Sequence, residues 1–130
     1  MNNNDKNKKI KVLLAEDEDI LRRIYLTKFE TEGLEVFAAI NGEEAFELAI
    51  KNEPDIILLD VIMPKADGFF TLKKLKENEK TKDIPVMMLT NLAQNGDLEE
   101  GKKLGAIDYL VKADLTPLQV VQKIKEFLKK

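Results

Sequence analysis

The feature that most constrains the fold of this chain is an alternation of short apolar runs with longer amphipathic stretches. The apolar runs occupy residues 10–15, 34–40, 55–60, 84–90 and 106–111. The first, third and fourth runs are almost continuously apolar, whereas half-exposed strands alternate apolar and polar residues. We therefore predict an α/β fold, in which a parallel five-stranded sheet is covered by helices on both faces.

The stretches between the apolar runs carry the periodicity and the end signals of helices. Asn41 and Thr116 each precede a glutamate or glutamine by three residues, which is the spacing of a capping box. The stretch at residues 98–104 is the weakest, because Gly96 and Gly101 lower its helix propensity. Candidate N-terminal caps are Asp19, Asn41, Asp67 and Thr116. The apolar positions that we expect to face the core are Leu21, Ile24, Tyr25, Phe29, Ala45, Phe46, Leu48, Ala49, Phe70, Leu72, Leu75, Val120, Val121, Ile124, Phe127 and Leu128.

The length and charge of the chain indicate one acidic domain. Its 130 residues suit a single domain, with residues 1–9 as a flexible N-terminal tail and residues 10–130 as the folded part. The tail holds three lysines and one aspartate, so the domain is more acidic than the net charge of -3 suggests. This acidity argues against direct binding to nucleic acid. No stretch has the roughly 20 apolar residues of a membrane span, so we expect a cytoplasmic protein without membrane insertion.

The chain contains no cysteine and no histidine. It therefore has no disulfide, no thiolate metal site and no cysteine nucleophile. It also lacks the usual phosphohistidine carrier, so any phosphoryl group that this chain handles must be brought by another molecule.

Polar residues follow four of the predicted strands at the point where each strand ends. Glu16 and Asp17 follow the first strand, Asp60 ends the third, Thr90 ends the fourth and Lys112 follows the fifth. Because ligands of open parallel sheets bind at the carboxyl ends of the strands, we expect these side chains to meet in one site. Each of them alone is more often an ordinary capping or surface residue, and it is their combination that indicates a site.

Crowded carboxylates repel one another unless a cation lies between them. Oxygen ligands suit Mg²⁺, which uses one or two carboxylates together with a substrate phosphate. An ionised aspartate can attack phosphorus directly and form an aspartyl phosphate without a general base. Asp60 would be the nucleophile, while Mg²⁺, Lys112 and Thr90 would contact the phosphoryl oxygens.

The segments VLLAEDE, IILLDVIMPKADG, VMMLT and DYLVK resemble, in this order, the receiver domains of response regulators in two-component signalling. The resemblance covers nearly the whole of residues 10–128 and implies the CheY-like, flavodoxin-like fold. It also implies the strand order 2-1-3-4-5, which the apolar pattern alone does not determine.

The resemblance implies a role for each matching residue. Asp60 is the phosphoacceptor, Thr90 the switch hydroxyl, and Lys112 the lysine that binds the phosphoryl group. Tyr109 matches the aromatic residue that turns inward on activation, although it also suits an ordinary half-buried strand position. The implied ligands of Mg²⁺ are Glu16, Asp17, Asp60 and the backbone carbonyl of Ile62. Met63, Pro64 and Gly68 match the family's residues in the loop after the phosphoacceptor and at the start of the helix that follows it.

Two positions depart from the receiver pattern. Asn91 follows Thr90 where a small residue is common, so we expect it to narrow access to the acceptor. Ala113 follows Lys112 where a proline joined by a cis bond is common. Either the bond is cis here as well, or it is trans and Lys112 is placed differently.

The resemblance implies a signalling switch rather than a metabolic enzyme. The expected function is that of a stand-alone response regulator receiver that catalyses only its own phosphorylation and slow dephosphorylation. A histidine kinase or a histidine phosphotransfer protein would donate the phosphoryl group, and an unknown downstream protein would read the changed surface. The protein would be a monomer or a phosphorylation-dependent dimer. Two alternatives are a pseudo-receiver that binds partners without phosphorylation, and a phosphohydrolase, which commonly has a second acid where this chain has Ile62.

Overall fold

The computed structural model describes residues 8–63, 67–91 and 97–129. Its strands are β1 (Lys11–Ala15), β2 (Glu35–Ala39), β3 (Ile56–Asp60), β4 (Val86–Thr90) and β5 (Asp108–Val111). Its helices are α2 (Asp19–Thr31), α3 (Gly42–Asn52), α4 (Gly68–Glu77), α5 (Asp97–Lys103) and α6 (Pro117–Leu128), with a short 3₁₀ turn at Lys112–Asp114. The five predicted strands and five predicted helices are therefore all present, with ends within a few residues of the predicted ones.

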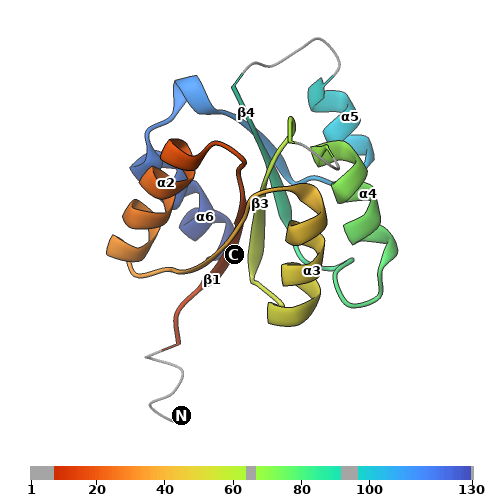
Figure 1. Ribbon diagram of the computed structural model, residues 1–130, viewed down its shortest axis with the longest axis horizontal. Helices are drawn as coiled ribbons and strands as arrows, with labels where there is room; N and C mark the ends of the chain where they lie inside the picture. The colour runs from red at the N-terminus through yellow and green to blue at the C-terminus, as the bar shows by residue number, and fades with distance from the viewer. Residues whose placement is uncertain (1–7, 64–66, 92–96, 130) are drawn as a thin grey trace.

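The five strands form one parallel sheet in the order β2-β1-β3-β4-β5, which confirms the implied order. Helices α2 and α6 lie on one face of the sheet, and α3, α4 and α5 lie on the other (Figure 1). The central strands β3 and β4 are buried along their whole length, as their continuous apolar runs predicted.

Successive side chains of each strand point to opposite faces and so supply two separate cores. Val12 and Leu14 of β1 pack with Tyr25 and Phe29 of α2 and with the buried face of α6. Leu13, between them, packs on the other side with the buried residues of α3 and α4. The sheet is thus held rigidly from both sides, and the loops at its carboxyl edge project from a fixed base.

Local hydrogen bonds fix the starts of three helices. The side chain of Asn41 accepts from the amide of Glu44 at 2.8 Å, and that of Asp67 accepts from the amide of Phe70 at 2.9 Å. Thr116 and Gln119 form a complete capping box. The three predicted caps are confirmed. They could be predicted from the sequence because each depends only on two residues three positions apart.

Four of the positions predicted from sequence were wrong. Asp19 does not cap α2: Glu18 occupies that position without a side-chain cap, and Asp19 begins the helix and pairs with Arg22. Ile24 and Phe70 are 48% and 57% exposed, and Phe127 is 37% exposed, although all three were predicted to face the core. Each lies next to a more deeply buried residue of the same helix (Tyr25, Thr71 and Leu128), so it is at the border of the face that packs on the core. Residues 1–7 of the predicted tail lie outside the described residues, and its last two residues, Lys8 and Lys9, are exposed. Pro64, in the loop after β3, also lies outside the described residues.

Candidate functional site

The sheet brings the predicted site residues to its carboxyl edge. Asp60 ends β3 and Thr90 ends β4, while Glu16 and Lys112 directly follow β1 and β5. The register of the parallel strands places Asp60 beside Leu89 and Thr90 beside Val111, so neighbouring strands end at the same level. Residues that are far apart in the sequence thereby meet because their strands are parallel and in register.

Glu16, Asp17 and Asp60 form a cluster of three carboxylates, whose nearest oxygens all lie within 4.8 Å of one another. Glu16 is 1% exposed and Asp60 is 5% exposed, whereas Asp17 faces solvent. Backbone amides hold two of the three: the amide of Glu18 donates to Oε2 of Glu16 at 3.0 Å, and the amide of Ile62 donates to Oδ1 of Asp60 at 3.3 Å. The carboxylates are therefore preorganised, with one open side at Asp17.

Lys112 provides the cation of this site. Its ammonium forms an ion pair with Oε1 of Glu16 and another with Oδ2 of Asp60, the latter at 3.0 Å. All three side chains are at least nine-tenths buried. The described part of the chain contains no cis peptide bond, so Lys112–Ala113 is trans, and the chain continues through the 3₁₀ turn at Lys112–Asp114. Of the two possibilities for this bond, the trans form holds, and Lys112 nevertheless reaches Asp60.

Burial raises the pKa of Asp60 to about 6, and the negative charge of Glu16 acts in the same direction. The hydrogen bond and the positive charge of Lys112 oppose this rise. Burial alone would lower the pKa of Lys112, but the bonds and charges of Glu16 and Asp60 raise it above the ordinary value. At neutral pH Asp60 is therefore mainly ionised, as a nucleophile toward phosphorus must be, and Lys112 is charged.

The donor set fits Mg²⁺. Three carboxylates carry three negative charges and Lys112 neutralises one of them, so the cluster keeps a charge that a divalent cation would balance. The ligands are hard oxygen atoms, and the open side at Asp17 leaves room for the waters that Mg²⁺ retains. The side chain of Ile62, two residues after Asp60, is 72% exposed.

Thr90 and Tyr109 lie on neighbouring strands beside the acidic cluster. Thr90 is buried at the end of β4. Tyr109 is half-buried on β5 and packs at the edge of the core that β4 and α5 share, where its ring lies close to Gly101. Asn91, directly after Thr90, is exposed. Thr90 and Tyr109 are thus both in the part of the sheet next to Asp60.

Sequence reasoning missed two features of the site. Arg22 binds the backbone of the acidic loop, and the only signal for it was its spacing of three residues from Asp19. Gly68, which the resemblance included, has an unpredicted role: its amide donates to the carbonyl of Val61 at 2.7 Å and brings α4 against the end of β3. Both depend on contacts between elements, which periodicity does not show.

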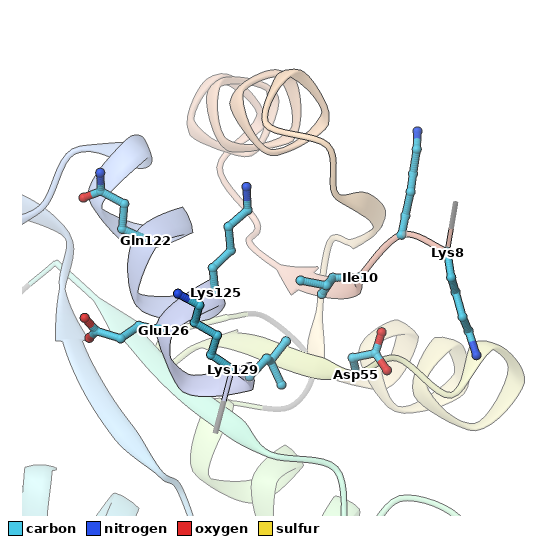
Figure 2. A pocket seen from close by; sticks show the side chains of 9 residues that line it. Lys8, Ile10, Asp55, Gln122, Lys125, Glu126 and Lys129 are labelled. Carbon is cyan, nitrogen blue, oxygen red and sulfur yellow. The ribbon is translucent and has the colours of Figure 1, made fainter. Parts of the chain in front are cut away.

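A hollow in the described part of the chain lies elsewhere. It has a volume of about 860 Å³ and is lined by residues that include Lys8, Ile10, Asp55, Lys125 and Lys129. Figure 2 shows it between α6 and the segment that leads into β1. Ile10 and Asp55 precede their strands, so the hollow lies at the amino edge of the sheet and is separate from the carboxylates.

None of the helices in the described residues combines the length and the apolar character that crossing a membrane requires.

Comparison with known proteins agrees with this geometry. The transcriptional regulatory protein SrrA of Staphylococcus aureus (strain NCTC 8325) is 39% identical over 119 residues, which are 92% of this chain and 48% of SrrA. The chain thus spans about half the length of the curated relatives that it matches. Among solved structures, the chemotaxis protein CheY4 of Vibrio cholerae is 31% identical with a TM-score of 0.85, and the match covers 92% of this chain and 98% of CheY4. The receiver domain of the Francisella response regulator 1452 is 32% identical with a TM-score of 0.83, over 93% of this chain and 98% of that domain.

The family described as the response regulator receiver domain matches residues 12–125. This match, the CheY-like fold and the cluster of carboxylates with its lysine all agree. The chain belongs to the response regulator receiver domain family of two-component signalling.

Proposed function

We propose that this domain is a Mg²⁺-dependent phosphorylation switch whose acceptor is Asp60. The observation that carries the proposal is the ion-paired cluster at the carboxyl edge, where Asp60 contacts Lys112 and lies beside Glu16 and Asp17. A histidine kinase or a histidine phosphotransfer protein, the usual partners of this family, would supply the phosphoryl group. The domain would act as a switch and not as a metabolic enzyme.

The chemistry requires one nucleophile and a surrounding set of positive groups. An ionised oxygen of Asp60 attacks phosphorus as the bond from phosphorus to the donor nitrogen breaks, and the bonding pair leaves with the nitrogen. The product is an aspartyl phosphate, and no proton has to leave Asp60. Lys112 already lies 3.0 Å from Oδ2 of Asp60 and can stabilise charge on the phosphoryl oxygens. Mg²⁺ bound by Glu16, Asp17, Asp60 and the carbonyl of Ile62 would supply further charge stabilisation.

The output would pass through Thr90 and Tyr109. A phosphoryl group on Asp60 brings new acceptor oxygens to the end of β3, next to β4, where Thr90 is buried. We expect the hydroxyl to bind one of these oxygens and Tyr109 to reorient in the space that this movement leaves. The surface of β5, α5 and α6 would then change its affinity for a partner protein.

The first test is the site of labelling. Wild-type protein incubated with Mg²⁺ and acetyl phosphate should gain one phosphoryl mass in intact-protein mass spectrometry, and Asp60→Asn should gain none. Asp55→Asn is a matched control, because Asp55 is exposed at the opposite end of the same strand. This variant should label like the wild type.

Other outcomes of this experiment would exclude the proposal. Labelling that persists in Asp60→Asn would place the acceptor elsewhere. No labelling of the wild type with either acetyl phosphate or a phosphorylated histidine phosphotransfer domain would indicate a pseudo-receiver. Turnover of many donor equivalents per minute would indicate a phosphohydrolase.

Asn91 provides a second prediction. It is exposed directly after Thr90, at the carboxyl edge of the sheet where Asp60 also lies. Asn91→Ala should accelerate both phosphorylation by acetyl phosphate and loss of the phosphoryl group several-fold, because the smaller side chain opens the approach. Time courses of intact mass at fixed Mg²⁺ would measure both rates. Equal rates in the two proteins would contradict a role for Asn91 in access.

A further inference from the structure

The loop between β1 and α2 carries two of the three clustered carboxylates, those of Glu16 and Asp17. Its first residue is fixed to the sheet, because the amide of Glu16 donates to the carbonyl of Ala39 at 3.0 Å. At its other end Glu18 is the N-cap residue of α2 and its side chain makes no cap hydrogen bond, although its amide donates to Oε2 of Glu16 at 3.0 Å. Asp17, which is exposed, lies between these two ends. The position of its carboxylate therefore depends on what holds the backbone of the loop.

Arg22 supplies that support from the first turn of α2. Its Nη1 donates to the carbonyl of Glu16 at 3.0 Å and to the carbonyl of Asp17 at 3.4 Å. Its Nη2 forms an ion pair with the carboxylate of Asp19. The Arg22 side chain is only 16% exposed, in contrast to most surface arginines. One planar group thus binds the backbone of both carboxylate-bearing residues and also the start of the helix.

We infer that Arg22 is a positioning residue for Mg²⁺ binding, which acts by fixing the backbone of Glu16 and Asp17. The inference rests on the proposed function, because it concerns the same metal site. A guanidinium has several donors in a rigid plane, whereas an ammonium is a point charge on a flexible stem. Groups that orient metal ligands typically change metal affinity by about 10- to 100-fold when they are removed.

The charge of Arg22 acts in the opposite direction to its hydrogen bonds. A guanidinium near the site repels a divalent cation, so removal of the charge by itself would strengthen Mg²⁺ binding. Removal of the backbone support would weaken it. The sign of the change therefore distinguishes a positioning residue from a nearby charge.

The neighbouring arginine gives a matched control. The side chain of Arg23 is exposed and makes no hydrogen bond or ion pair within the part of the chain that the structure describes. Arg23→Gln removes the same charge one residue further along α2 and leaves the loop contacts intact. Arg22→Lys retains the charge of Arg22 and loses the planar set of donors.

The experiment is a titration of the full chain with MgCl₂ alone, in which binding is measured by isothermal titration calorimetry and by ¹H–¹⁵N spectra. The four proteins are the wild type, Arg22→Gln, Arg22→Lys and Arg23→Gln. We expect the Kd of Mg²⁺ to rise about tenfold in Arg22→Gln, to rise less in Arg22→Lys, and to stay within about twofold of wild type in Arg23→Gln. Amide hydrogen exchange at residues 16–19, measured without metal, should accelerate in Arg22→Gln only. Phosphorylation of Arg22→Gln by acetyl phosphate should recover at saturating Mg²⁺.

The outcomes separate this inference from the proposed function. Wild-type affinity, or tighter binding, in a folded Arg22→Gln would overturn the inference and leave the proposed function intact. A wild-type protein that binds no Mg²⁺ would overturn the proposed function, and the metal role of Arg22 with it. If Arg22→Gln does not fold, Arg22→Lys decides: unchanged affinity and unchanged exchange at residues 16–19 would overturn the inference.

Discussion

Lys112→Met is expected to lower the free energy of unfolding by about 3 kcal/mol at pH 7, because it leaves two buried carboxylates without their cation. Glu16 and Asp60 both pair with Lys112, and all three side chains are nearly inaccessible to solvent. Methionine keeps much of the volume of the lysine stem, so the change mainly removes charge. Urea unfolding followed by circular dichroism would measure the loss.

The effect of Lys112→Met should depend on pH. The folded-state pKa of Asp60 is raised to about 6, mainly by burial, and loss of the lysine would raise it further. A carboxyl with a raised pKa destabilises the fold when it is ionised, and this cost fades as the pH falls through the folded-state pKa. Lys112 has a raised pKa, so its contribution is fully present below its ordinary pKa and is lost only at more alkaline pH. The deficit of the variant should therefore be smaller at pH 5 than at pH 7.

Two further variants test this account of Lys112. Lys82→Met is a control, because Lys82 pairs with Glu79 on the exposed surface and should contribute less than about 1 kcal/mol. Adding Asp60→Asn to Lys112→Met should restore part of the stability, since one of the two uncompensated charges is gone. A loss in Lys112→Met no larger than that in Lys82→Met would contradict the role of the ion pairs.

Gly68→Ala should cost roughly 3 kcal/mol and should also impair labelling of Asp60. A methyl group on Gly68 would lie 2.3 Å from the backbone oxygen of Asp60 and 2.7 Å from Cα of Val61. Both atoms belong to the backbone at the end of β3, so they cannot rotate away as a side chain would. Either α4 moves outward and buries less of Leu72, or the acceptor itself is displaced. Urea unfolding and acetyl phosphate labelling would report the two consequences separately.

Gly101→Ala is the matched control for Gly68→Ala. Its methyl group would meet Tyr109, Met88 and Phe69 at 3.5 to 3.7 Å, which are ordinary contact distances. Because alanine has a higher helix propensity than glycine, the substitution in α5 should stabilise the protein by about 0.5–1 kcal/mol. Equal effects of the two alanine substitutions would show that the contact at Gly68 does not constrain the end of β3.

Much of the fold could be predicted from local patterns. The continuous apolar runs at β3 and β4 indicated strands that are buried on both faces, and both strands are fully buried. Caps at Asn41, Asp67 and Thr116 could be predicted because each requires only a side chain and an amide three residues away. The strand order came from the resemblance to receivers, since periodicity does not specify which strands are neighbours.

The borders of the apolar faces were predicted less well. Phe70 follows Phe69 at the start of α4, and the wrong one of the two was predicted to face the core, although Phe69 lies three residues before the buried Leu72. Exposure at such a border depends on how far the neighbouring helix reaches, which is a tertiary property. Ile24 and Phe127 also lie at such borders and are exposed.

The sequence by itself determined which residue types make up the candidate site: an aspartate as the proposed acceptor, two further acids, a hydroxyl and a lysine, all at the ends of apolar runs. Strand ends can be read from a sequence because buried strands must be apolar and the first polar residue after them marks the edge. Only the tertiary structure decided how these groups interact. It showed that Lys112 reaches both Glu16 and Asp60 from a trans peptide bond, that Arg22 holds the acidic loop, and that Gly68 fits against the acceptor strand. These contacts join segments from different elements, and their distances depend on the packing of the helices on the sheet, which no local pattern contains.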